Sequence, residues 1–93
     1  MALRERLMDL AGALACVTSA PDGYPDFMSY EGNKADIIAL WAEIKPKLKR
    51  DLEKVQIIDL KLEEMFAAYD SGNVEGGRDA AWALYNMNVK KLR

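Results

Sequence analysis

Residues 37–69 read IIALWAEIKPKLKRDLEKVQIIDLKLEEMFAAY, and in this stretch an apolar side chain recurs at every turn of a helix. The mean step between these side chains is about 3.6 residues, which is the period of one helix face. The pattern therefore predicts a long helical segment with one buried stripe. The side chains of this predicted stripe are Ile37, Trp41, Ile44, Leu48, Leu52, Val55, Ile58, Leu62, Phe66 and Tyr69.

Pro46 lies inside this segment, and the sequence leaves two arrangements open. Proline lacks a backbone N–H and clashes with the preceding turn of a helix. Either one helix spans residues 34–45 and a second spans 46–70, or a single helix kinks at Pro46. The unbroken phase of the stripe favours the kink, and it places Leu52 in the core, so that Leu52→Asp should unfold the protein. Asn33 is the expected N-cap.

The length of this segment bears on the oligomeric state. A straight helix over residues 34–70 would be about 55 Å long, whereas a domain of this size has a radius of gyration of about 12 Å. The chain must therefore fold back at Pro46, or a second chain must cover part of the stripe. A chain of 93 residues also has a small core, and oligomerisation commonly adds stability to such chains. We expect a homodimer.

Two further helices are predicted on either side of the central segment. The first spans residues 2–17, in which apolar residues recur with the spacing of a packed helix seam. They are Leu3, Leu7, Leu10, Leu14 and Val17. The last helix spans residues 74–92 and follows a short turn, so it should lie antiparallel to its predecessor. Its expected inner face consists of Arg78, Ala81, Trp82, Tyr85, Val89 and Leu92.

These elements predict an all-α fold in one domain, residues 1–93, with three to four helices and a C-terminal antiparallel helical hairpin. Hydrophobic residues make up 51% of the chain and charged residues 30%, which is ordinary for a folded globular protein. The sequence shows neither a secretion signal nor an apolar stretch long enough for a membrane span. A single cysteine fits a reducing compartment, so we expect a cytoplasmic location.

Residues 18–33 are predicted to form the one long loop. Large apolar side chains are unusual in a passive linker, yet this loop contains Tyr24, Phe27, Met28 and Tyr30. Two interpretations remain open. These side chains either fill the core of a small bundle or anchor a partner protein, as exposed aromatic groups do at many interfaces.

The residues that usually perform catalysis are scarce. The chain contains no histidine and one cysteine, and histidine is the commonest general base and metal ligand near neutral pH. Cys16 lies near the carboxyl end of a predicted helix, where the dipole disfavours a thiolate. We therefore expect no enzymatic activity, catalytic residue, cofactor or metal. One alternative is a metal or small-molecule site lined by carboxylates, for which the candidates are Asp59, Glu63, Glu64 and Asp70.

A second alternative concerns basic residues. The face of the predicted helix 46–70 that carries Lys47, Arg50, Lys54 and Lys61 could bind nucleic acid. The net charge of −2 argues against this role, as do the acidic residues within the same run.

The leading hypothesis is a non-enzymatic interaction or regulatory module that binds a protein partner or itself. Helix faces and the aromatic loop would supply the contacts. Charge is unevenly distributed, because residues 1–44 carry a net charge of −4 and residues 45–93 carry +2. Such asymmetry would orient a partner or a second copy.

Overall fold

The computed structural model describes residues 3–20, 23, 24 and 28–93. Within these ranges the chain forms four α-helices and two short 3-10 helices. The α-helices are α1 (Leu3–Val17), α2 (Tyr30–Ile44), α3 (Leu52–Asp70) and α4 (Val74–Asn86), and the 3-10 helices are η1 (Lys45–Lys47) and η2 (Val89–Lys91). The predicted all-α fold is confirmed.

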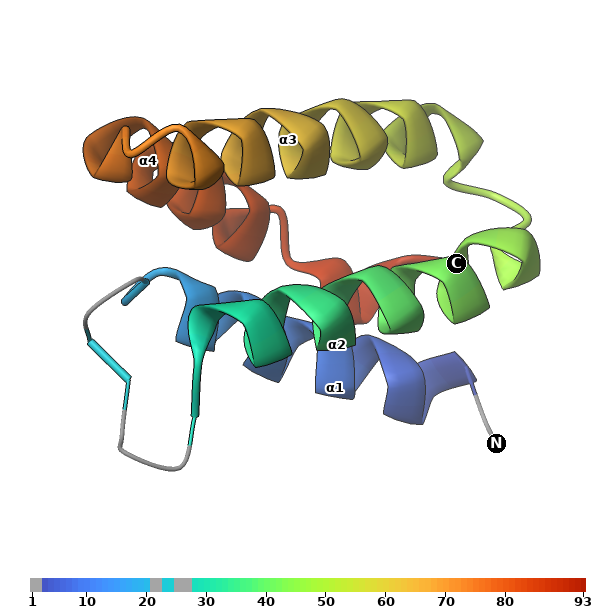
Figure 1. Cartoon of the computed structure of the whole chain (residues 1–93). Coiled ribbons are helices and arrows are strands. Elements are labelled where there is room, and N and C mark those ends of the chain that lie inside the picture. Colours follow the sequence, from blue (N-terminus) through green and yellow to red (C-terminus); the bar gives the residue numbers. More distant parts are fainter. Residues whose placement is uncertain (1–2, 21–22, 25–27) are drawn as a thin grey trace.

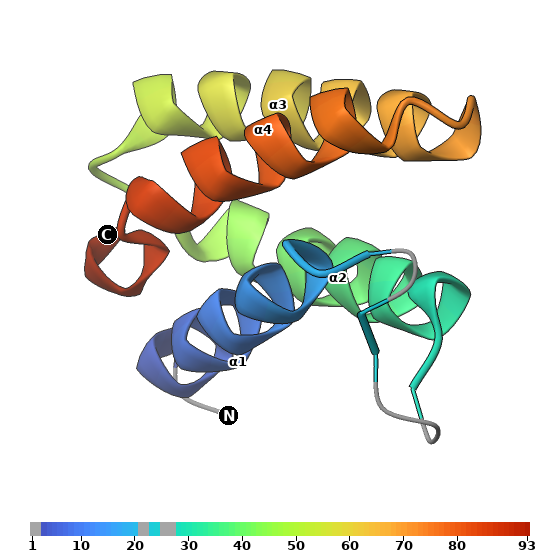
Figure 2. The same ribbon diagram turned by 90° about the vertical axis from the view of Figure 1, so that its left-hand side faces the viewer.

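The helices are arranged as two antiparallel pairs in two layers. α1 and α2 form the lower layer in Figure 1, and α3 and α4 form the upper layer. The view in Figure 2 shows the same two layers, with η2 close to α1. The pair α3–α4 is the predicted C-terminal hairpin. Its turn contains Gly72 at φ +87°, a conformation that glycine adopts without steric cost.

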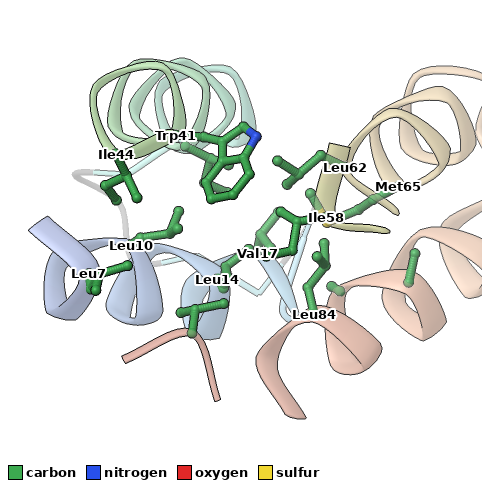
Figure 3. Close-up of a cluster of buried hydrophobic side chains, with 14 of the residues drawn as sticks. Leu7, Leu10, Leu14, Val17, Trp41, Ile44, Ile58, Leu62, Met65 and Leu84 are labelled. Carbon is green, nitrogen blue, oxygen red and sulfur yellow. The ribbon is translucent and has the colours of Figure 1, made fainter. Parts of the chain in front are cut away.

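The core lies between the two layers. Side chains from all four α-helices converge there, and the indole ring of Trp41 points into the cluster (Figure 3). The predicted seam of α1 is confirmed, because Leu7, Leu10, Leu14 and Val17 are almost fully buried. Burial of such side chains is the main force that holds a bundle of this size together.

Helix α2 ends just before Pro46, so the chain does not form a single kinked helix there. Pro46 lies in η1, and the next residue but one, Leu48, has extended backbone angles (φ −77°, ψ 135°). The new helix starts at Leu52 and returns along the other layer. The expectation that Leu52 belongs to the core is therefore wrong, since its exposed fraction is 58%. The stripe keeps its phase along the sequence, but the helix does not continue through it.

The second helix begins earlier than predicted, and Asn33 is not its N-cap. The Ser29 side chain accepts a hydrogen bond from the Gly32 amide at 3.0 Å and so caps α2. Asn33 is buried one turn into α2. Its side-chain amide donates to the Ala13 carbonyl at 3.1 Å, so the polar group that was expected to cap a helix instead joins α2 to α1.

The last helix is shorter than predicted, and its inner face differs. α4 is capped by Asn73, whose side chain accepts from the Gly76 amide, and it ends at Asn86. Asn88 then adopts a left-handed conformation (φ 57°) before η2. The expectation that Trp82 and Tyr85 are core residues is wrong, because they are 50% and 44% exposed. The inner face of α4 consists of Leu84 and three small residues, Gly77, Ala80 and Ala81.

Tyr69 ties the two layers together at the carboxyl end of α1. Its hydroxyl is buried and donates a hydrogen bond of 2.7 Å to the Val17 carbonyl, a group that α1 itself leaves without a partner. The Val17 carbonyl also accepts from the Ala20 amide at 3.2 Å. Tyr69→Phe therefore removes one of two donors and should lower the free energy of unfolding by about 1 kcal/mol.

Urea denaturation followed by circular dichroism measures this loss. Tyr30→Phe is the matched control, because the Tyr30 hydroxyl bonds to Asp70 at an exposed position, and we expect a clearly smaller loss there. Equal losses for the two variants would contradict the assignment of Tyr69 as the link between layers.

Candidate binding site lined by basic side chains

The aromatic residues predicted in the loop contact other parts of the chain. The Tyr24 hydroxyl donates a 2.6 Å hydrogen bond to Asn33, and burial raises the pKa of Tyr24 to about 12. Tyr30 belongs to α2, and its ring lies 5.4 Å from that of Tyr69. Met28 lines a hollow between α1 and α2, and Phe27 lies outside the described residues. Their role in partner binding stays a prediction.

The predicted basic face is divided by the break at Pro46. Lys47 belongs to η1 and Arg50 to the connection that follows, whereas Lys54 and Lys61 lie on α3. Lys61 forms an ion pair of 3.1 Å with Glu64 on the same helix. Because no continuous helix joins the four residues, they do not form the single face that the sequence indicated.

Lys47 and Arg50 instead line an open hollow with a volume of about 780 Å³. Its walls come from three segments that are far apart in the sequence: the first turns of α1, residues 47–50, and residues 90–93. Leu3, Leu7 and Leu92 also line this hollow, which we call the basic hollow. The basic side chains that line it are Arg4, Lys47, Lys49, Arg50, Lys90, Lys91 and Arg93.

Backbone hydrogen bonds hold two walls of the basic hollow together. The amides of Arg50 and Asp51 both donate to the Arg93 carbonyl at 2.9 Å. The Arg93 amide in turn donates to the Asp51 carboxylate at 2.9 Å. Leu48 and Leu92 are buried beside these bonds and fix each segment to the core. The basic side chains are thus brought together by a defined backbone pairing.

The charged side chains that line the basic hollow all carry the same sign. All seven basic residues are exposed. Among the described residues, 3–20, 23, 24 and 28–93, one of these seven side chains forms an ion pair with a carboxylate. It is Lys47, which lies 4.0 Å from Glu43. Like charges gathered in a concave surface reinforce one another and create a positive potential that attracts anions. The basic hollow therefore has the chemistry of an anion-binding surface.

Three of the four carboxylates considered for a metal site, Asp59, Glu64 and Asp70, have partners within the chain. Asp59 accepts hydrogen bonds from Trp41 at 2.7 Å and from Lys45 at 2.8 Å. Partial burial opposes its ionisation, but these two donors outweigh that effect and hold the pKa of Asp59 below its usual value. Asp70 accepts from Lys34 and Tyr30. In the part of the chain that the structure describes, no group of three or more acidic or cysteine side chains is placed to hold a metal ion.

Comparisons with known protein families, with curated proteins and with solved structures find no match to this chain. The geometry alone must therefore indicate the function. Among the described residues, no helix has both the length and the apolar character needed to cross a bilayer.

Sequence reasoning found two of the seven basic residues in the hollow. The density of lysine and arginine over residues 45–50 and again over 90–93 was a visible signal. That these two runs meet each other and Arg4 depends on the break at Pro46 and on η2, which are tertiary features.

Proposed function

We propose that this protein is a non-enzymatic binding module that captures an acidic segment of a partner protein in the basic hollow. The observation that supports this proposal is the convergence of seven basic side chains on one concave surface in a chain whose net charge is −2. Such a cluster raises the free energy of the folded protein through repulsion, and an anionic partner relieves that repulsion. The lack of histidine supports a role without catalysis, and the single cysteine fits a cytoplasmic location.

The lining of the basic hollow favours a peptide over a nucleic acid. Three leucines contribute to it, and the aliphatic stems of lysine and arginine add further apolar surface. A peptide with carboxylates and apolar side chains complements such a mixed surface. Single-stranded nucleic acids usually need aromatic side chains on which bases stack, and none of the described lining residues is aromatic. The acidic remainder of the protein would also repel a long polyanion.

Charge reversal on two walls of the basic hollow tests this proposal. The double variant Lys49→Glu/Lys91→Glu should weaken binding of a fluorescent polyglutamate peptide at least about tenfold, measured by fluorescence anisotropy at low salt. The matched control is Lys54→Glu/Lys61→Glu, which changes net charge equally but lies outside the hollow. We expect the control to bind almost as well as the original protein.

Three results would overturn the proposal. The first is an absence of polyglutamate binding at low salt. The second is an equal loss of affinity in both double variants, because the effect would then follow overall charge and not the basic hollow. The third is tighter binding of a labelled single-stranded DNA than of polyglutamate at the same salt concentration. If Lys49→Glu/Lys91→Glu also lost that DNA binding, the basic hollow would be a nucleic-acid site.

A further inference from the structure

A second hollow, which has Lys90 as the one basic residue in its described lining, continues from the basic hollow along α1. It has a volume of about 510 Å³ and lies between α1 and residues 85–90. Lys90 lines both hollows. Along α1, the lining passes from Leu7 in the basic hollow to Met8, Ala11, Gly12 and Ala15 in the second one. We call this second hollow the α1–α4 groove.

Exposed apolar side chains lie on both sides of the α1–α4 groove, whose lining also includes Asn86 and Asn88. Met8 on α1 is 55% exposed, and Tyr85 lies across the groove on α4. Trp82 extends this apolar surface, because its ring makes an edge-to-face contact of 5.6 Å with the ring of Tyr85. Exposed apolar surface next to a concavity is unfavourable in water and is typical of a surface that binds a partner.

The floor of the α1–α4 groove is open to an incoming chain. A Cβ atom placed at Gly12 would meet nothing within 4 Å, and its neighbours on this face are alanines. Residues 3–15 of α1 border the two hollows in succession, a distance of about 18 Å. An extended peptide covers that distance with about six residues.

We propose that the partner segment runs through both hollows, with its acidic residues in the basic hollow and an adjoining apolar stretch in the α1–α4 groove. This inference rests on the proposed function and adds the second half of the ligand. It is argued from the charge complementarity of the basic hollow and from the continuity that Lys90 and α1 give to the two surfaces. The ligand is therefore an acidic segment next to apolar side chains, not an acidic segment alone.

Three fluorescent peptides separate the two halves of the ligand. The first is a block of about three glutamates, which in extended form covers the basic hollow and ends before the α1–α4 groove. The second joins this block to leucine and phenylalanine residues, and the third replaces the glutamates of the second by serine. The mixed peptide should bind at least about tenfold more tightly than the acidic block, because it buries apolar side chains as well.

Two variants of the groove locate this gain. Gly12→Gln fills the floor with a neutral side chain that suits a helix, and Tyr85→Ala removes one wall. Both should bind the acidic block as the original protein does and should lose the additional affinity for the mixed peptide. The matched control is Leu60→Gln, which changes an exposed apolar residue that lies outside both hollows and should keep the gain.

The outcomes distinguish failure of this inference from failure of the proposed function. If the acidic block binds but the apolar stretch adds no affinity, or if Gly12→Gln keeps the gain, the inference is wrong and the basic hollow stands alone. If the acidic block does not bind, both proposals fall. Sedimentation adds one more outcome: a dimer of the original protein that becomes a monomer in Gly12→Gln would show that a second copy occupies the groove, which would also overturn the inference.

Discussion

Ile58→Asp should abolish cooperative folding, whereas Leu52→Asp should leave the protein folded. Ile58 is 1% exposed and lies in the core between the layers. An aspartate there would bury a carboxylate without a partner and remove a large apolar side chain, at a combined cost of about 5 kcal/mol or more. That cost is comparable to the whole stability of a small domain. Circular dichroism during heating should show no cooperative transition for Ile58→Asp.

Leu52→Asp is the matched control, because it also replaces an aliphatic residue by aspartate, about 1.7 turns away on α3. Leu52 is more than half exposed at the first position of that helix, where a negative charge interacts favourably with the helix dipole. Its melting temperature should stay within a few degrees of the original value. Unfolding of Leu52→Asp would contradict the break at Pro46 and would restore the continuous stripe.

Gly77→Ala should destabilise the protein by about 2–3 kcal/mol, although alanine is the better helix former. A Cβ atom at Gly77 would lie 2.6–2.7 Å from three carbon atoms of the Tyr69 ring. That ring is buried and held by its hydrogen bond to Val17, so it has little freedom to move away. The packing of α4 against α3 thus depends on the missing side chain. Urea denaturation measures the change.

Gly12→Ala is the control for this substitution. Gly12 is also within a helix, but nothing lies near its would-be Cβ. The intrinsic helix propensity should therefore act alone and stabilise the protein by about 0.5–1 kcal/mol. Opposite signs for the two variants are the expected result. A gain in stability at both positions would show that α4 does not approach Tyr69 closely.

The fold class was predictable because apolar periodicity depends on local geometry. The seam of α1 and the turn before α4 are encoded in short windows of sequence, and both were predicted. The break at Pro46 was not, because the spacing of apolar residues stays in phase whether or not the helix continues. The side chain of Leu48 is buried although its backbone is not helical. Its spacing from the other apolar residues is the same as that of a helical residue, so the spacing does not reveal the break.

The errors at Trp82 and Tyr85 have a different cause. Large aromatic side chains at helical spacing usually indicate a core, and the competing inner face consists of small residues, which contribute little to a hydrophobic pattern. Gly77, Ala80 and Ala81 allow α4 to lie close to its neighbours, and this close approach directs the two aromatic rings outward. The α1–α4 groove was therefore invisible to sequence reasoning, although both rings were noted.

The basic hollow illustrates a limit of one-dimensional reasoning about charge. The sequence pattern predicts that Lys47 and Arg50 share a helix face with Lys54 and Lys61. The structure keeps the first two together and adds residues from both ends of the chain. Which charges gather depends on which backbones pair, and that pairing is formed by Arg93 with residues 50 and 51.

If an anionic segment binds in the basic hollow as we propose, this pairing couples its binding to the stability of the fold. Three hydrogen bonds join segments that are more than forty positions apart, and the seven basic side chains of the hollow surround them. The bound anion would reduce the repulsion between the basic side chains and would contact both segments at once. On this proposal, the free energy of unfolding should rise with the concentration of the bound anion through mass action.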